Sequence, residues 1–144
     1  MWTAKRGNNG FDDTNVYFHL DQSQRYIQSL GFTGTKSIIN RPLDVDTDGL
    51  NGDDNSHYSG GAAGSDYLAF GHGCVNDSED ADVILHEYGH GIQANINSGW
   101  TGGDTGAMGE GFGRVVAVAA VSLAAHGLLV LRFGLDEIGR ASCR

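Results

Sequence analysis

Two stretches of the chain carry apolar residues at the spacing of an α-helix. The first is predicted to run from a cap at Thr14 to a stop at Gly31, with a core face formed by Val16, Leu20, Ile27 and Leu30. The second follows a cap at Asp77 or Ser78 and fades over residues 95–99, with an apolar face formed by Val83, Ile84, Leu85 and Ile92. Residues 1–12 are polar and glycine-rich, so we expect them to be irregular.

The segment between these helices predicts short strands. Residues 55–58 and 66–71 flank a glycine-rich turn and are expected to form two strands joined by a loop. A further short strand is expected at residues 37–39. Asp104 or Thr105 is expected to cap a third helix, which carries Glu110.

Composition narrows the class of protein. The chain has 144 residues, which predicts one domain, and 40% hydrophobic residues, which suffice for a core. The net charge of −9 argues against nucleic acid and against anionic membrane surfaces as partners. Two cysteines are too few for a disulfide framework, and the N-terminal residues lack the apolar run of a signal peptide.

The most specific chemistry lies in the second helix, where residues 86–90 have the pattern H-E-x-x-H. His86 and His90 are four positions apart, so they share one helix face with Cβ atoms about 5–6 Å apart and can bind one Zn²⁺. Glu87 lies about 100° around the helix, beside the metal, where it can take a proton from water. Glu110, twenty residues after His90, is the candidate third ligand.

This motif, followed by a glutamate at this distance, resembles the gluzincin metallopeptidases, the relatives of thermolysin and fungalysin. Tyr88 and the run Gly-Glu-Gly-Phe-Gly at residues 109–113 are more similar to the fungalysin side. The resemblance covers about residues 11–113. It implies an α+β, zincin-like fold: a small mixed sheet with its edge strand over the helix of the H-E-x-x-H motif, followed by a second helix with the third ligand.

The resemblance implies a zinc-dependent endopeptidase that is secreted and acts on peptides or proteins. His86, His90 and Glu110 would be its zinc ligands and Glu87 its general base. Family members also use a histidine or tyrosine from a later helical subdomain, and no residue of this chain takes that place. The alternative is therefore a fragment that binds metal without hydrolysing peptides.

Two further sites are open to interpretation. Asn55 and Ser56 resemble the start of the family's cleft-facing edge strand, which would bind substrate as an added strand, although an ordinary sheet edge explains them too. Asp44, Asp46 and Asp48 are spaced like the start of a calcium loop, but the twelfth position is an asparagine. A solvated acidic loop is the alternative to Ca²⁺ there.

The chain departs from the family after residue 113. Relatives have an aspartate where this chain has Arg114, a cation four residues after Glu110 that could compete with the metal for its carboxylate. Residues 115–125 are apolar on every helical face, which suggests a buried helix, a frameshift near residue 113, or a marginal membrane span. Residues 138–144 resemble a translated sequencing adapter. We therefore expect a partial catalytic domain over residues 1–137, in which residues 114–137 are either native or out of frame, followed by a non-native tail.

Overall fold

The computed structural model describes residues 3–60, 64–99 and 102–128. In chain order its elements are α1 (Asn9–Ser29), the 3₁₀ turn η1 (Gly34–Lys36), β1 (Asp44–Asp46), β2 (Ser56–Ser59), β3 (Tyr67–Phe70), the 3₁₀ turn η2 (Asp77–Glu79), α2 (Ala81–Ile96) and α3 (Gly103–Leu128). The described residues thus form a small mixed α+β domain, which confirms the α+β class that was expected.

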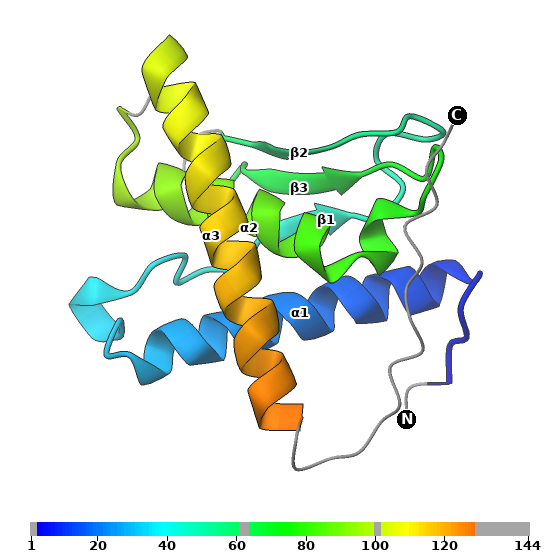
Figure 1. The fold of residues 1–144 in the computed structure, drawn as a ribbon, viewed down its shortest axis with the longest axis horizontal. Helices are drawn as coiled ribbons and strands as arrows, with labels where there is room; N and C mark the ends of the chain where they lie inside the picture. Colours follow the sequence, from blue (N-terminus) through cyan, green and yellow to red (C-terminus); the bar gives the residue numbers. More distant parts are fainter. Residues whose placement is uncertain (1–2, 61–63, 100–101, 129–144) are drawn as a thin grey trace.

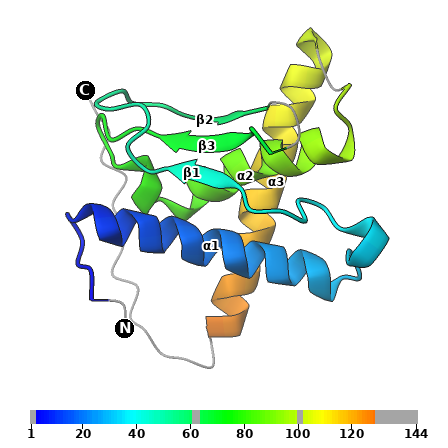
Figure 2. The same ribbon diagram turned by 180° about the vertical axis from the view of Figure 1, so that it is seen from behind.

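The three strands form one mixed sheet in the order β1–β3–β2 (Figure 1). β1 runs parallel to the central strand β3, and β2 runs antiparallel to it. The two strands expected on either side of the glycine-rich turn are therefore confirmed, and β2 is an edge strand. The opposite views in Figures 1 and 2 place α2 in the middle of the molecule, with α3 on one side and the sheet and α1 on the other.

A cluster of fully buried side chains joins α1, β3 and α2. It consists of Val16, Leu68, Phe70 and Ile84, each at most 1% exposed. Burying each such side chain typically contributes about 1.5–3 kcal/mol, so this cluster holds α2 against the sheet. Val16, Leu20 and Ile27 pack into the core as expected, whereas Leu30 at the end of α1 is exposed.

A second cluster lies along the other part of α2 and includes the residue next to the candidate base. Ile39, Tyr88 and Ile92 form it, and Val116 of α3 packs against it. The hydroxyl of Tyr88 donates a hydrogen bond to Gln24 of α1, 2.5 Å away. The helix with the H-E-x-x-H motif is therefore fixed on both flanks.

The beginning of α1 differs from the prediction. Asn8, not Thr14, is the cap: its side-chain oxygen accepts a hydrogen bond from the backbone N–H of Gly10 at 2.9 Å. Residues 9–12, expected to be irregular, are helical. Thr14 lies inside the helix, where its hydroxyl donates to the carbonyl of Gly10.

The short strand also lies elsewhere than expected. No strand forms at residues 37–39: residues 38 and 39 are a bend in which Ile39 has a φ of +49°, and the strand is formed by Asp44–Asp46 instead. Both aspartates are exposed, so the strand has none of the apolar alternation that would reveal it in the sequence.

The helix caps around the motif are shifted as well. Asp80 caps α2 by accepting from the backbone N–H of Asp82 at 2.8 Å, because Asp77 and Ser78 belong to the separate turn η2. α2 ends at Ile96, inside the region 95–99 where it is expected to fade. α3 begins at Gly103, just before both predicted caps.

α3 continues without a break through residues 114–128. Ala117 is buried, but Val115 is 66% exposed and Val118 is 64% exposed, so residues 115–119 are not buried on every face. Among the described helices, none combines the length and apolar character that crossing a membrane requires. The frameshift over residues 114–137 stays a prediction, and the expected tail lies outside the described residues.

Candidate metal centre

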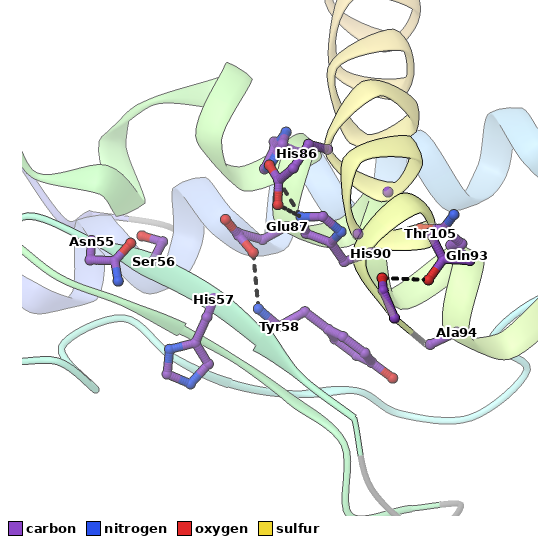
Figure 3. Close-up of a pocket in the computed structure, with 14 residues that line it drawn as sticks. Asn55, Ser56, His57, Tyr58, His86, Glu87, His90, Gln93, Ala94 and Thr105 are labelled. Atoms are coloured by element: carbon purple, nitrogen blue, oxygen red, sulfur yellow. Dashed lines mark hydrogen bonds and ion pairs between the residues drawn. The ribbon is translucent and has the colours of Figure 1, made fainter. Parts of the chain in front are cut away.

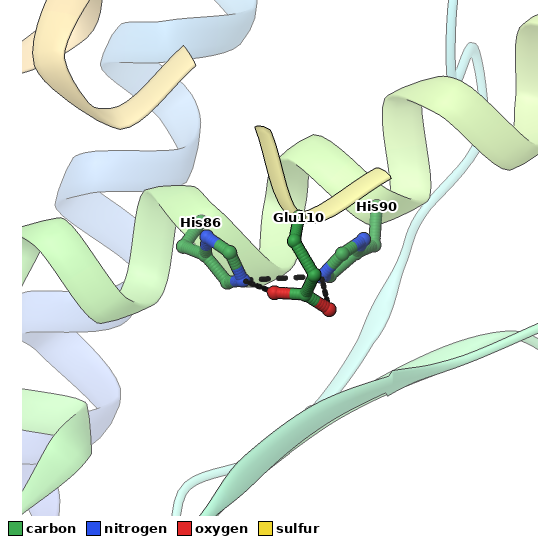
Figure 4. Close-up of side chains that lie close together, drawn as sticks. All are labelled: His86, His90 and Glu110. Carbon is green, nitrogen blue, oxygen red and sulfur yellow. Dashed lines mark hydrogen bonds and ion pairs between the residues drawn. The ribbon is translucent and has the colours of Figure 1, made fainter. Parts of the chain in front are cut away.

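α2 and α3 bring the three predicted zinc ligands together. Nε2 of His86 and Nε2 of His90 are 3.1 Å apart, as their spacing on one helix face predicts. The Glu110 carboxylate reaches both rings from α3, with Oε2 3.1 Å from His86 and Oε1 3.6 Å from His90 (Figure 4). Within the described residues, this is the one group of three His, Cys, Asp or Glu side chains close enough to hold a metal ion.

The distances among these atoms fit a small tetrahedral cation. Ligand atoms about 2.0–2.1 Å from a tetrahedral zinc lie about 3.3–3.4 Å from one another. The three measured separations, 3.1, 3.1 and 3.6 Å, lie on either side of that value. Two imidazoles and one carboxylate are also a ligand set that zinc accepts, with a fourth position left for water or substrate. The residues present therefore fit zinc.

Glycines allow α3 to approach the histidines. A Cβ atom built on Gly89 of α2 would lie only 2.8 Å from the Cα of Gly113, so the two helix backbones are in contact there. One turn earlier on α3, a Cβ on Gly109 would lie 3.0 Å from Oε1 of Gln93. Glu110 stands between these two contacts, and the close crossing places its carboxylate at the rings.

Glu87 lies beside the ligands and points toward the edge strand (Figure 3). The side chain is nearly buried, with 8% exposed, and its Oε2 accepts a hydrogen bond from the backbone N–H of Tyr58 at 2.9 Å. Burial raises the pKa of Glu87, and the neighbouring Glu110 carboxylate adds to the rise, whereas His90 and the Tyr58 N–H oppose it. A raised pKa suits a group that must take up and release a proton near neutral pH.

A cavity of about 600 Å³ opens in front of these residues. β2 forms one wall, and α2 and the first turns of α3 form the other. Asn55 and Ser56 lie on the β2 wall, where the Ser56 hydroxyl donates to Asp77 at 2.7 Å. The His57 ring points to the opposite side of the strand from Glu87 (Figure 3). Substrate binding by Asn55 and Ser56 stays a prediction.

The three aspartates of the expected calcium loop lie apart from this centre. Asp44 and Asp46 are exposed residues of β1, and Oδ1 of Asp48 pairs with Nδ1 of His72 at 2.7 Å. Oδ1 of Asp46 accepts the backbone N–H of Asp48 at 3.1 Å, as in a tight acidic turn. Calcium binding there stays a prediction.

Arg114 does not form the expected ion pair with Glu110 within the described part of the chain. The Glu110 carboxylate faces the two histidines instead, and Arg114 is exposed. No contact among the described residues therefore supports the suggestion that Arg114 competes with a metal ion for the Glu110 carboxylate.

Sequence reasoning missed two contributions to the centre. The backbone N–H of Tyr58 could not be anticipated, because it depends on where β2 lies relative to α2. Gly89, Gly109 and Gly113 did carry a signal: glycines inside helices cost stability and therefore point to a close contact.

Comparison with protein-family models, with curated proteins and with solved structures finds no match for this chain. The resemblance to the gluzincins therefore depends on the motif and its spacing alone.

Proposed function

We propose that this chain carries the zinc centre of a metalloendopeptidase, with His86, His90 and Glu110 as ligands and Glu87 as general base. The supporting observation is the convergence of all four side chains at one cavity, with ligand separations that suit zinc. Three protein ligands leave one position for water or substrate, which is typical of catalytic rather than structural zinc sites.

Zinc held there would supply a Lewis acid toward water and toward a peptide carbonyl. Glu87 takes the proton of the attacking water on its carboxylate and delivers it to the leaving amine. Its burial and the hydrogen bond from Tyr58 keep the carboxylate in place for both transfers. Among the described residues β2 pairs with β3 on one side only, so the backbone groups of its other edge, apart from the Tyr58 N–H that Glu87 occupies, are available to align an extended peptide.

A second candidate is a centre that binds metal without turnover. The Glu110 side chain is 64% exposed, so the described residues leave this side of the ligand group largely open to solvent. Peptidases need walls that fix the substrate and exclude water, and the cavity between β2 and the two helices is open to solvent at Glu110. The proposal also includes secretion of the protein, which is supported by the resemblance to the gluzincins alone.

The test compares the chain with its Glu87→Gln variant. The amide preserves the shape of the side chain but takes up no proton near neutral pH, so zinc content should stay at one per molecule. Hydrolysis of a labelled unfolded protein should fall at least about 100-fold, the usual value of general-base catalysis. Asp82→Asn removes an exposed carboxylate from the same helix and serves as the matched control.

Three outcomes are distinguishable. A chain that binds no zinc would contradict both candidates. Zinc binding without hydrolysis, in the unsubstituted chain and in the control, would favour the centre without turnover. A Glu87→Gln variant that keeps more than about a hundredth of the rate would show that another group is the base.

A further inference from the structure

Tyr58 makes two contacts that connect the candidate base to Asp66, a buried carboxylate directly before β3. Its backbone N–H donates to Oε2 of Glu87 at 2.9 Å, and its hydroxyl donates to Oδ2 of Asp66 at 3.1 Å. The first contact lies on the free edge of β2, and the second is made by the side chain. One residue therefore couples the position of Glu87 to that of Asp66.

Asp66 is itself held by a cation. Its side chain is nearly buried, and Arg41 forms an ion pair with the same oxygen that accepts from Tyr58. Arg41 also donates to Oδ1 of Asn95 on α2 at 2.8 Å. Burial alone would raise the pKa of Asp66, but the hydrogen bonds from Arg41 and Tyr58 outweigh it and keep this pKa below its usual range. The carboxylate is therefore charged near neutral pH and anchored to α2.

The ring of Tyr58 fixes the distance between β2 and α2. A Cβ atom on Gly91, the residue after His90, would lie 3.3 Å from two carbon atoms of this ring, so the ring lies directly on the α2 backbone. The strand cannot approach the helix more closely, and the Asp66 contact prevents it from sliding away.

Stability alone is a weak explanation for this arrangement. Oδ1 of Asp66 and Nε of Arg41 are both buried without a hydrogen-bond partner among the described residues. Removing a charged pair from water is costly, and well-packed apolar residues often stabilise a fold as much or more. The buried pair of Arg41 and Asp66 is better explained by a positional role: it fixes β2 in one arrangement relative to α2.

We propose that Arg41, Asp66 and Tyr58 form a positioning chain for Glu87. These three residues hold the edge of β2 so that the Tyr58 N–H occupies Oε2 of Glu87. Oε1 is then the oxygen that takes the proton from water and delivers it to the leaving amine. None of the three touches the reacting atoms through its side chain. The consequence for catalysis depends on the proposed function, whereas the mechanical coupling between Asp66 and Glu87 does not.

Tyr58→Phe tests this coupling, because it removes the hydroxyl and keeps the ring and the backbone N–H. Amide hydrogen exchange at residue 58 is measured by NMR in the full chain without added metal. Exchange there should become about tenfold faster, the effect typical of losing one hydrogen bond to a charged group. Tyr67→Phe is the matched control: Tyr67 is on β3, is 39% exposed, and should leave the residue-58 amide unchanged within about twofold.

Two further measurements separate positioning from general loss of stability. Zinc affinity of Tyr58→Phe should stay within about threefold of the unsubstituted chain, because no ligand is changed. In a chain that hydrolyses peptides, kcat per bound zinc should fall about tenfold while KM changes little, because the loss concerns only the base. Should Tyr58→Phe fail to fold, Asp66→Asn is measured in the same way.

Unchanged exchange at residue 58, in a folded variant of either kind, would overturn the positioning chain. Exchange that rises equally at every amide of β2 would overturn it too, because it would show only a destabilised strand. A chain that binds no zinc or hydrolyses no peptide would contradict the proposed function alone, since the exchange measurement needs neither metal nor substrate.

Discussion

Gly113 of α3 and His86 of α2 lie in direct contact, with no space for a side chain between them. A Cβ atom on Gly113 would lie 2.8 Å from Nδ1 of His86 and 3.0 Å from its backbone oxygen. The imidazole is thereby enclosed by the helix that also carries Glu110. The geometry of the metal centre depends on this contact as much as on the ligands.

Gly113→Ala should therefore weaken zinc binding. Alanine favours a helix by about 1 kcal/mol over glycine, so propensity alone would stabilise α3. The added methyl group would instead push α3 away from His86 and separate Glu110 from the rings. We expect a loss of about 10–100-fold in zinc affinity, as is typical when the residues that orient a ligand are changed. Competition with a chromogenic chelator measures it.

Gly111→Ala is the control for this prediction. Gly111 lies on the exposed side of the same helix, and a Cβ atom added to it would have no neighbouring atom within 4 Å. The substitution should raise the free energy of unfolding by up to about 1 kcal/mol and leave zinc affinity unchanged. Equal zinc affinities in the two variants would show that the contact between Gly113 and His86 does not matter for the metal.

The purified chain should bind one zinc per molecule, and His86→Ala or His90→Ala should each abolish stoichiometric binding. Each substitution leaves only two of the three ligands. His57→Ala should keep the zinc, because the ring of His57 points to the other side of β2 (Figure 3). Metal analysis after gel filtration measures the content. One zinc retained in the double alanine variant would contradict the ligand assignment.

Asp66 should contribute stability that depends on pH. Its pKa is lower in the folded chain than in the unfolded one, where it is about 3.9. The contribution is therefore fully present above about pH 4 and is lost as the pH falls from there through the folded pKa. Asp66→Asn should be less stable at pH 7, and its stability should fall less steeply below pH 4.

Urea unfolding between about pH 2.5 and pH 7 measures this difference. Asp53→Asn is the matched control, because Asp53 is exposed and forms no ion pair within the described residues. An acid slope in Asp66→Asn equal to that of the unsubstituted chain would show that the pair with Arg41 contributes no linked stability.

Asn8→Ala should destabilise the chain by about 1 kcal/mol, because the α1 cap loses its hydrogen bond to the Gly10 N–H. Thr14→Ala should cost less than about 0.5 kcal/mol, because Thr14 is inside the helix, where alanine has the higher propensity. Thermal unfolding of the two variants compares them. A larger loss for Thr14→Ala would place the functional cap at Thr14 after all.

The sequence by itself determined the parts of the centre that depend on neighbouring residues. His86 and His90 share a helix face because they are four residues apart, and Glu87 must then lie beside them. The apolar spacing around them marked the helix, and the glycine-rich turn marked the two antiparallel strands. These features follow from backbone geometry over a few residues, so a single sequence suffices to predict them.

Only the tertiary structure decided how distant segments meet. Glu110 reaches the histidines because two helix backbones touch at Gly89 and Gly113, and Glu87 is held because β2 lies against α2. β1 was missed because its pairing with β3 joins residues more than twenty positions apart and has no apolar pattern. Such contacts depend on how the helices and strands pack together. The free energy of that packing depends on residues from the whole domain, so no short segment of the sequence reveals it.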